Sequence, residues 1–265
     1  MKKVLVTGGT GILGSEVVKQ LLSLNYGVCV LSSKKNPKVP EGVQLIHGDL
    51  VTGKGLKEAT ENTDIIIHCA SNPKDTENVD IKGTQNLLQA IDKDITKHFI
   101  FISIINVDKS DYTYYKTKAQ VEKMIAGSGI PFSILRTTQF HNYVLAIIKS
   151  LDKNNGEIVI PDRMRFQSID VSEAAALLVN LAGSSPVGLL AGTGGPQVLK
   201  FERMFKTYLK VLDRHNDLKT KPIEREEYDR YRSANNLWRS NPYGEINWEN
   251  FLQHQFHDHL AMLRA

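Results

Sequence analysis

The stretch that decides the fold is a glycine-rich run near the start of the chain, Thr7-Gly8-Gly9-Thr10-Gly11-Ile12-Leu13-Gly14. The apolar run Lys3–Thr7 precedes it, and Gly11–Leu24 follows with apolar side chains at helical spacing. The run fits both G-x-G-x-x-G and G-x-x-G-x-x-G. After a strand and before a helix, such glycines allow a tight turn, a close approach of backbone to a pyrophosphate, and close helix packing.

A helix that begins at such a turn also presents free N–H groups and the positive end of its dipole to an anion. The sequence therefore predicts that a dinucleotide lies against Gly8, Gly9, Thr10, Gly11, Ile12, Leu13 and Gly14. A glycine-rich turn without a ligand is the alternative.

The first half of the chain alternates strand-like and helix-like segments. We expect strands at Lys3–Thr7, Gly27–Leu31, Gln44–Ile46, Asp64–Cys69, Phe99–Ser103 and Phe132–Leu135, and helices at Gly11–Leu24, Gly53–Thr60, Asp80–Ile91 and Tyr114–Ala126. Continuous apolar strands are covered on both faces, and alternating strands and helices form right-handed βαβ units. The pattern predicts an α/β fold with a Rossmann-like, doubly wound parallel sheet.

The regular alternation of strand-like and helix-like segments ends after Arg136. A turn at Asn154-Asn155-Gly156 leads into a strand at Glu157–Ile160, and a helix is expected at Val171–Leu181. The last 66 residues are richer in charge, and we expect them to form helices on one edge of the sheet. The prediction is a dinucleotide-binding core in residues 1–135, to which later segments return, and a small, mostly helical substrate-side lobe in residues 136–265.

Composition narrows the function classes. The chain has 33 Lys and Arg against 29 Asp and Glu and is 41% hydrophobic, which is typical of a folded protein and gives no basic arm for nucleic acid. No apolar run is long enough to span a membrane. The two cysteines, Cys29 and Cys69, lie in strand-like segments and are interpreted as free thiols in a cytoplasmic protein. The oligomeric state stays open.

The end of the second strand bears on which dinucleotide is bound. NAD-selective proteins usually place an acid there to bind the ribose 2′-hydroxyl, but this chain has Ser32-Ser33-Lys34-Lys35. Hydroxyl groups followed by two cations suit the additional 2′-phosphate of NADP(H). The sequence favours NADP(H) over NAD(H), with a solvated basic loop as the alternative.

Together with these features, several motifs resemble the short-chain dehydrogenase/reductase superfamily and its atypical NmrA-like group. They are His47-Gly48-Asp49-Leu50, His68-Cys69-Ala70-Ser71, Asp80–Leu87, Phe101–Asp108, Tyr114–Lys118, Ile134–His141 and the tail around Trp248–Leu252. The resemblance implies that Asp49, followed by Leu50, accepts a hydrogen bond from the adenine amino group. It also implies that the backbone at Cys69, Ala70 and Ser71 lines the adenosine ribose, and that Ser103 and Lys118 contact the cofactor.

The group includes NADPH-dependent quinone and carbonyl reductases, and also dinucleotide-sensing regulators. Its reductases use a Tyr and a Lys four residues later, which share one helix face. The Lys favours ionisation of the phenol and holds the nicotinamide ribose, while the Tyr protonates the carbonyl oxygen. Here Tyr114 with Lys118 matches best, and Tyr112 with Lys116 also has the spacing.

The departure from the family pattern is at the third catalytic position, where a Ser or Thr is usual and this chain has Ile104. Ser103 comes one residue early, and a shift of one residue in a strand turns a side chain to the opposite face. We therefore expect weaker support for ketone chemistry than for quinone reduction, because a quinone needs less acid assistance.

Further along, Gln139, Phe140 and His141 follow a strand end, where open α/β sheets bind ligands. They are candidate substrate-pocket residues, with packing as the alternative, and Tyr143 and Phe166 could add apolar walls. No metal site is expected, because His254, His257 and His259 fit an exposed amphipathic helix better than a metal cluster.

Three functions are open at this stage. The first is an NADP(H)-dependent oxidoreductase that reduces a quinone or a small carbonyl compound. The second is a non-catalytic NADP(H)-binding redox sensor that acts through a protein partner, which Ile104 favours. A nucleotide-sugar epimerase fits less well, because the second lobe is short and the usual Ser or Thr is absent.

Overall fold

The structure is a computed structural model that describes residues 1–152 and 156–257. The chain forms two compact units. Unit 1 contains Met1–Arg136 and Ala174–Ala191, and unit 2 contains Thr137–Glu173 and Gly192–Ala265. The chain therefore leaves unit 1 after Arg136, and the segment Ala174–Ala191 returns to it.

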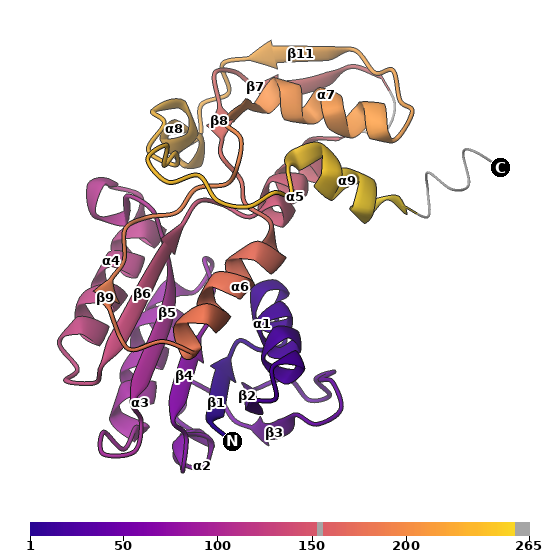
Figure 1. The fold of residues 1–265 in the computed structure, drawn as a ribbon. Coiled ribbons are helices and arrows are strands. Elements are labelled where there is room, and N and C mark those ends of the chain that lie inside the picture. Colours follow the sequence, from indigo (N-terminus) through magenta and orange to yellow (C-terminus); the bar gives the residue numbers. More distant parts are fainter. Residues whose placement is uncertain (153–155, 258–265) are drawn as a thin grey trace. The chain divides into compact units, whose positions relative to one another are not determined.

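The core of unit 1 is a seven-stranded parallel sheet, which confirms the predicted fold class (Figure 1). Its spatial order is β3 (Gln44–His47), β2 (Gly27–Ser32), β1 (Lys3–Thr7), β4 (Ile65–His68), β5 (His98–Ile104), β6 (Phe132–Thr137) and β9 (Gly188–Leu189). The chain runs outward from β1 to β3 and then crosses back to β4. Ligands of doubly wound sheets bind at such a reversal, beyond the carboxyl ends of the strands.

Helices cover both faces of this sheet (Figure 1). One face packs on α2 (Leu56–Thr60), α3 (Gly83–Ala90) and α4 (Thr113–Ala126) through a core that includes Leu5, Ile66, Leu87, Phe99, Phe101 and Val121. The other face carries α1 (Ile12–Ser23) and the unit 1 part of α6 (Val171–Ala182). Because both faces are covered, the central strands are largely buried: β4 is buried along its whole length, and β1 at every residue except Lys3.

Two helices differ from the prediction. The helix expected at Gly53–Thr60 begins only at Leu56, because Gly53 and Gly55 have φ of 79° and 74°, which is outside the helical region. The helix expected at Asp80–Ile91 begins earlier, with a π-helical segment η1 (Glu77–Lys82) that runs into α3. A short 3₁₀ turn η2 (Val107–Lys109) precedes α4.

Unit 2 contains α5 (His141–Leu151), β7 (Ile158–Pro161), β8 (Arg165–Phe166), β10 (Leu199–Lys200), α7 (Phe201–Val211), β11 (Leu218–Lys221), α8 (Glu226–Arg232) and α9 (Trp248–Gln255). Strand β7 pairs in parallel with β11, and β8 pairs antiparallel with β10. The predicted turn at Asn154-Asn155 lies outside the described residues.

The expectation that the C-terminal helices pack on one edge of the main sheet is wrong. The apolar faces of α7 and α9 are buried in a separate core of unit 2, which includes Phe166, Phe201, Phe205, Tyr208, Trp248 and Leu252. Large aromatic side chains make this core possible, because each buries enough area to hold short elements together.

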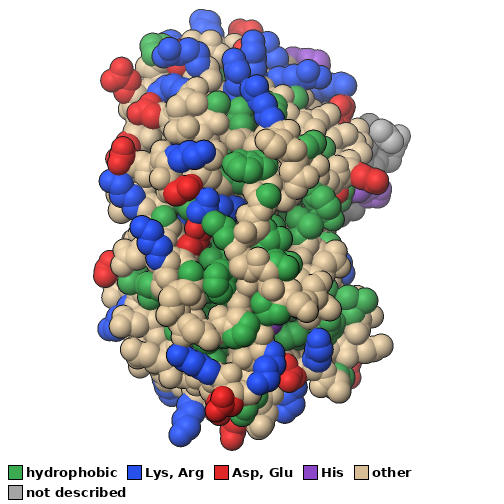
Figure 2. All heavy atoms as spheres, turned by 60° about the vertical axis from the view of Figure 1, so that its left-hand side comes forward, with side chains coloured by type: hydrophobic (Ala, Val, Ile, Leu, Met, Phe, Trp, Pro, Cys, Tyr) green, Lys and Arg blue, Asp and Glu red, His purple; other side chains and the backbone are tan. Residues whose placement is uncertain are grey.

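The face drawn in Figure 2 does not carry charge of a single sign. Lys and Arg side chains occur together with Asp and Glu along one margin and at both ends of this face, and its middle is mostly uncharged. Among the residues that the structure describes, no helix has the length and apolar character needed to cross a membrane.

Candidate functional site

Three of the four glycines in the predicted phosphate loop are required by packing. A Cβ on Gly8 would lie 2.7 Å from the Ala70 nitrogen, and Gly8 also has a φ of 68°. A Cβ on Gly14 would lie 2.2 Å from the Gly8 carbonyl oxygen, and one on Gly9 would lie 2.7 Å from the Val30 side chain. These glycines let the turn lie close to the segment after β4, to β2 and to the first turn of α1.

Gly11 is different. Its φ of −90° and ψ of 175° are open to other residues, and a Cβ there would meet only the Gly8 carbonyl oxygen, at 3.2 Å. Helix α1 begins at the next residue, without a side-chain cap and without an acidic residue in its first turn. The first N–H groups of α1 thus face an open, uncapped approach, which suits the pyrophosphate of a dinucleotide.

The segment after β2 brings a cation to this loop. The Lys34 ammonium donates a hydrogen bond to the Thr10 carbonyl oxygen at 3.3 Å, and the Lys34 backbone N–H donates to the Ser32 hydroxyl at 3.3 Å. Ser32 is buried, while Ser33, Lys34 and Lys35 are exposed. The structure therefore places the exposed Lys34 side chain beside the glycine-rich loop.

Asp49 and Leu50 follow β3 in a turn. Asp49 Oδ1 accepts a hydrogen bond from the Val51 N–H at 2.7 Å, which fixes the carboxylate, and the Asp49 side chain is partly exposed. The Leu50 carbonyl oxygen accepts a bond from the Asn86 side chain at 2.8 Å. Both residues are thus held by local hydrogen bonds at the carboxyl end of the strand.

The next strand end contributes Cys69, Ala70 and Ser71, all partly buried. The Cys69 N–H donates to the Thr7 carbonyl oxygen at 3.1 Å, which ties this segment to the start of the glycine run. Burial raises the pKa of the Cys69 thiol to about 12, so the thiol is neutral. Cys29 is buried, and neither cysteine forms a disulfide.

The most unusual feature of unit 1 is a buried ion pair beside this segment. The Lys118 ammonium lies 3.6 Å from Asp80 Oδ1, and the two side chains are 4% and 2% exposed. Asp80 Oδ1 also accepts a hydrogen bond from the Ser71 hydroxyl at 2.6 Å, and Asp80 Oδ2 accepts one from the Asn72 N–H at 2.9 Å. The carboxylate is therefore fixed by a cation and two donors.

Tyr114 joins this network through Ser71, with 2.9 Å between the two hydroxyl oxygens. A hydroxyl has one proton, and that of Ser71 is given to Asp80, so the Tyr114 phenol donates to Ser71. The Lys118 ammonium lies 5.9 Å from the centre of the Tyr114 ring and 4.5 Å from that of Phe101. The structure thus brings Tyr114 and Lys118 together.

The alternative pair does not converge in this way. The side chain of Lys116 is 61% exposed, and its ammonium lies 3.0 Å from the exposed Asp111 carboxylate. A cation in that position is solvated and does not face the strand ends. Of the two pairs with the right spacing, only Tyr114 and Lys118 reach the carboxyl edge of the sheet together.

Ser103 and Ile104 lie at the end of β5, which continues through Ile104. Ser103 shares its face of the strand with Phe101 and therefore with the Lys118 ammonium, while Ile104 is partly exposed on the opposite face. Ser103 is 2% exposed, and within the described residues its hydroxyl has no hydrogen-bond partner. A buried hydroxyl of this kind fits a dinucleotide that would supply the missing partner.

His68 holds Asp80 in place through Thr84. Its Nδ1 lies 2.6 Å from the Thr7 hydroxyl and its Nε2 lies 3.0 Å from the Thr84 hydroxyl, which donates to the Asp80 carbonyl oxygen at 2.5 Å. Because Thr84 uses its proton there, His68 donates from Nε2 and accepts at Nδ1. Burial, with the nearby Lys118 charge, lowers the pKa of His68 to about 3, so its ring is neutral.

Asp80 is the residue of this network that the sequence did not single out, since its segment Asp80–Leu87 entered only as one of the motifs that carry the family resemblance. A signal was present: Asp80, Thr84 and Leu87 are spaced as one helical stripe, and all three are buried. A carboxylate on an otherwise buried stripe indicates a fixed partner for a charge.

The three candidate pocket residues belong to unit 2. Gln139 and Phe140 are partly buried and pair with Ile169, whose N–H donates to the Gln139 carbonyl oxygen at 3.0 Å. His141 is 1% exposed; its Nε2 donates to the Ile246 carbonyl oxygen at 2.9 Å and its Nδ1 accepts from Ser168 at 2.7 Å. For His141 this geometry corresponds to packing, the alternative that the sequence left open.

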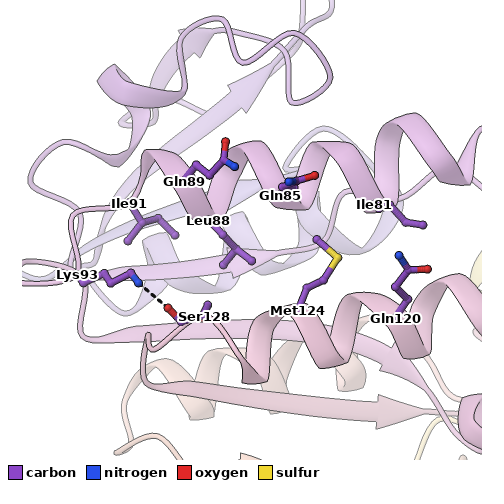
Figure 3. Close-up of a pocket in the computed structure, with 9 residues that line it drawn as sticks. All are labelled: Ile81, Gln85, Leu88, Gln89, Ile91, Lys93, Gln120, Met124 and Ser128. Atoms are coloured by element: carbon purple, nitrogen blue, oxygen red, sulfur yellow. Dashed lines mark hydrogen bonds between the residues drawn. The ribbon is translucent and has the colours of Figure 1, made fainter.

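A groove of about 630 Å³ lies between α3 and α4 (Figure 3). The Lys93 ammonium donates to the Ser128 carbonyl oxygen at one end of it, at 2.7 Å. None of the predicted site residues is among its nine lining residues. In the part of the chain that the structure describes, no group of three or more His, Cys, Asp and Glu side chains could hold a metal, and His259 lies outside that part.

Comparison with known proteins gives relatives of different kinds. The photosystem II assembly factor Ycf39 of Trieres chinensis is 30% identical over 160 residues, which cover 56% of this chain and 50% of that protein. The NADPH-dependent quinone oxidoreductase QOR2 of Escherichia coli, solved with NADPH, has a TM-score of 0.80 and 14% identity and covers 96% of this chain and 99% of its own. A UDP-glucose 4-epimerase of Thermotoga maritima, solved with UDP-glucose, has a TM-score of 0.77 and 16% identity, covering 97% and 99%.

The likeness to the two solved structures concerns the fold. The chain spans 62%, 50% and 45% of the length of the first curated relatives that it matches. The model of the NmrA-like family matches residues 1–180, which include the glycine loop, the Asp80 network and β6. The chain therefore belongs to the NmrA-like family, with the fold of the atypical short-chain dehydrogenases/reductases.

Proposed function

We propose that the chain is an NADP(H)-dependent oxidoreductase that reduces a quinone or a small carbonyl compound. The observation that carries the proposal is the convergence of Tyr114 and the buried Lys118 on the carboxyl edge of a dinucleotide-type sheet. Burying an ammonium costs free energy unless an opposite charge compensates it. Buried charged groups are therefore found mainly at functional sites.

Binding is assigned to residues of unit 1. The glycine loop, Gly8 to Gly14, holds the pyrophosphate at the N-terminus of α1, and Lys34 with Ser33 holds the 2′-phosphate. Asp49, followed by Leu50, accepts from the adenine amino group. The backbone of Cys69, Ala70 and Ser71 lines the adenosine ribose, while Ser103 and Lys118 contact the nicotinamide side.

When bound, the reduced nicotinamide supplies a hydride to the acceptor. Tyr114 then has two tasks: its hydroxyl orients the acceptor oxygen and donates a proton to it. Lys118 supplies a positive charge that favours the negative charge left on the phenol. A quinone accepts hydride readily and depends less on this proton, so quinone reduction tolerates Ile104 better than ketone reduction does.

The test mixes the purified protein with NADPH and a panel of quinones and aldehydes and follows the absorbance of the reduced cofactor. Consumption of NADPH that depends on the acceptor supports the proposal. Tight NADPH binding with no consumption across the panel would overturn it.

A variant pair assigns the acid. Tyr114→Phe is expected to lower carbonyl turnover by about 10²- to 10⁴-fold, the usual range for a positioned proton donor. Tyr112→Phe is the matched control, because it removes a tyrosine hydroxyl at the same end of α4. An unchanged carbonyl rate in Tyr114→Phe would show that Tyr114 is not the acid.

A non-catalytic redox sensor that acts through a protein partner is the second candidate. Two observations favour it: Ile104 at the usual Ser or Thr position, and the relationship to Ycf39, which is named as an assembly factor. A sensor binds NADPH and NADP⁺ with different affinities and turns over neither. Equal affinity for the two forms would count against it.

A further inference from the structure

We propose that Asp80 is a positioning residue that, acting through Ser71, holds Tyr114 as a neutral phenol against the influence of Lys118. The inference rests on the proposed reductase function and concerns the same site. It assigns a role to a carboxylate that the sequence alone did not single out.

The direction of the hydrogen bonds is the first argument. Ser71 Oγ lies 2.6 Å from Asp80 Oδ1 and 2.9 Å from the Tyr114 oxygen, and its single proton is donated to the carboxylate. Ser71 can therefore only accept from Tyr114. A bond in which the phenol donates stabilises the protonated phenol and disfavours the phenolate.

The charges give the second argument. Lys118 favours a phenolate at Tyr114, but its ammonium lies 3.6 Å from Asp80 Oδ1, so the carboxylate offsets that positive charge. Both side chains are almost fully buried, and screening by solvent is therefore weak. The electrostatic potential at the Tyr114 hydroxyl is therefore much closer to zero than it would be if Lys118 had no carboxylate beside it.

The surrounding titratable groups do not alter this balance near neutral pH. From β4 and the segment after it come His68, with a pKa of about 3, and Cys69, with a pKa of about 12; both are neutral. From α4 the neighbouring ring is that of Tyr115, and β5 contributes the uncharged side chains Phe101 and Ser103. The charged groups of the network are Asp80 and Lys118.

The backbone geometry supports a dedicated position for Asp80. It lies in η1, a π-helical segment, and such segments frequently mark functional sites. Its carbonyl oxygen is held by Thr84, which His68 holds in turn, and its carboxylate by Ser71, Asn72 and Lys118. Both the backbone and the side chain of Asp80 are thus held by hydrogen bonds.

One consequence concerns the substrate. Because the phenol proton is directed at Ser71, a carbonyl oxygen must compete with Ser71 for it. This competition weakens acid catalysis for ketones and leaves direct hydride transfer to quinones less affected. The network therefore points to electron-poor acceptors, with quinones preferred over simple ketones.

The test is a titration of the protein without any cofactor. With tyrosine labelled by ¹³C at the ring carbon that carries the oxygen, NMR follows each phenol separately, and the Tyr114 signal is identified by its loss in Tyr114→Phe. Asp80→Asn is expected to lower the midpoint of the Tyr114 titration by about one to three pH units, the usual effect of losing a close like charge.

Ser71→Ala is the second variant, in case Asp80→Asn does not fold. It removes the acceptor of the phenol and is expected to lower the midpoint as well, by less than Asp80→Asn does, since the carboxylate stays. Glu122→Gln is the matched control. Glu122 is a buried acid on α4 that is paired with Arg136, and it lies about 12 Å from Tyr114 along the helix axis. It should leave the midpoint unchanged.

The outcomes separate the two proposals. An unchanged Tyr114 midpoint in both Asp80→Asn and Ser71→Ala overturns the role of Asp80, even if the protein reduces quinones. A lowered midpoint supports that role even if no NADPH is consumed, in which case only the reductase function fails. If turnover is present, the high-pH limit of carbonyl reduction should move to lower pH in Asp80→Asn by the same amount as the midpoint.

Discussion

The two units differ in what they bury. At the carboxyl edge of its sheet, unit 1 buries an ion pair, a neutral histidine and a hydroxyl without a partner in the described residues. The interior of unit 2 is a core of aromatic and aliphatic side chains, which also buries Arg230 against Tyr231. Its buried histidine, His141, uses both ring nitrogens for bonds inside the unit and packs 5.1 Å from the ring of Phe251.

Buried charge is costly, and an apolar replacement of similar volume is often at least as stable. The polar interior of unit 1 is therefore hard to explain by stability alone, whereas the aromatic interior of unit 2 is what packing requires. The comparison teaches that the first residues to test for chemistry lie at the strand ends of unit 1, while the hydrogen bonds of His141 serve the packing of unit 2.

The largest expected effect comes from breaking the ion pair of unit 1. Lys118→Met leaves the Asp80 carboxylate buried without its cation, and the free energy of unfolding should fall by about 3–5 kcal/mol. Urea unfolding measures it. The double variant Lys118→Met/Asp80→Asn should recover much of the loss, because no buried charge remains. A double variant as unstable as the single one would contradict this explanation.

The second effect is a loss of stability in acid. His68 and His98 have pKa values lowered by burial to about 3 and about 4, and burial also lowers the pKa of His141. In the unfolded chain these histidines have a pKa near 6.5, so they bind protons at a higher pH than they do in the folded protein. The free energy of unfolding therefore falls progressively below pH 6.5. Each histidine contributes up to about 1.4 kcal/mol per pH unit.

Urea unfolding between pH 7 and pH 5 checks this slope. His68→Gln should reduce the slope by the share of one histidine and leave the contribution of His141 in unit 2. A stability that does not change over this range would show that these histidines are not held neutral in the folded protein.

The third effect distinguishes a glycine that leaves room for a ligand, Gly11, from one that the packing of the loop requires, Gly8. Gly11→Ala should weaken NADPH binding about tenfold, or about 1.4 kcal/mol, and leave the unfolding midpoint nearly unchanged, since its Cβ meets only one atom. Gly8→Ala is the matched variant: its Cβ meets the Ala70 backbone and its φ is positive, so it should lower stability directly. Calorimetric titration and thermal unfolding measure the two quantities.

If Gly11→Ala lowered stability as much as Gly8→Ala does and left NADPH affinity unchanged, the uncapped N-terminus of α1 would not be a ligand site. The comparison between a binding edge in unit 1 and a packed interior in unit 2 would then lose its main support.

The smallest effect concerns cofactor choice. Lys34 is exposed, so Lys34→Glu should cost little stability but weaken NADPH more than NADH, by roughly tenfold, through repulsion of the 2′-phosphate. Lys38→Glu, a change of the same charge in an exposed segment nearby, is the control. Equal losses for NADPH and NADH in Lys34→Glu would refute the assignment of the 2′-phosphate.

Much of unit 1 could be predicted from its sequence. The glycine spacing, the apolar strands and the helical stripes are local patterns, and each is set by the conformations that a short segment can adopt. The bounds of α2 and of η1 were less predictable, because Gly53 and Gly55 take positive φ and the π-helical segment depends on what Asp80 contacts.

By itself, the sequence determined the fold class and the family resemblance, while its spacing left two Tyr and Lys pairs, of which Tyr114 with Lys118 matched the family motif better. Only the tertiary structure decided that Lys118 is buried on Asp80, that Ser71 connects Tyr114 to that carboxylate, and that the C-terminal helices have a core of their own. The physical reason is distance along the chain: Ser71 and Tyr114 are 43 residues apart, so the contact that sets their chemistry exists only once the strands and helices have packed.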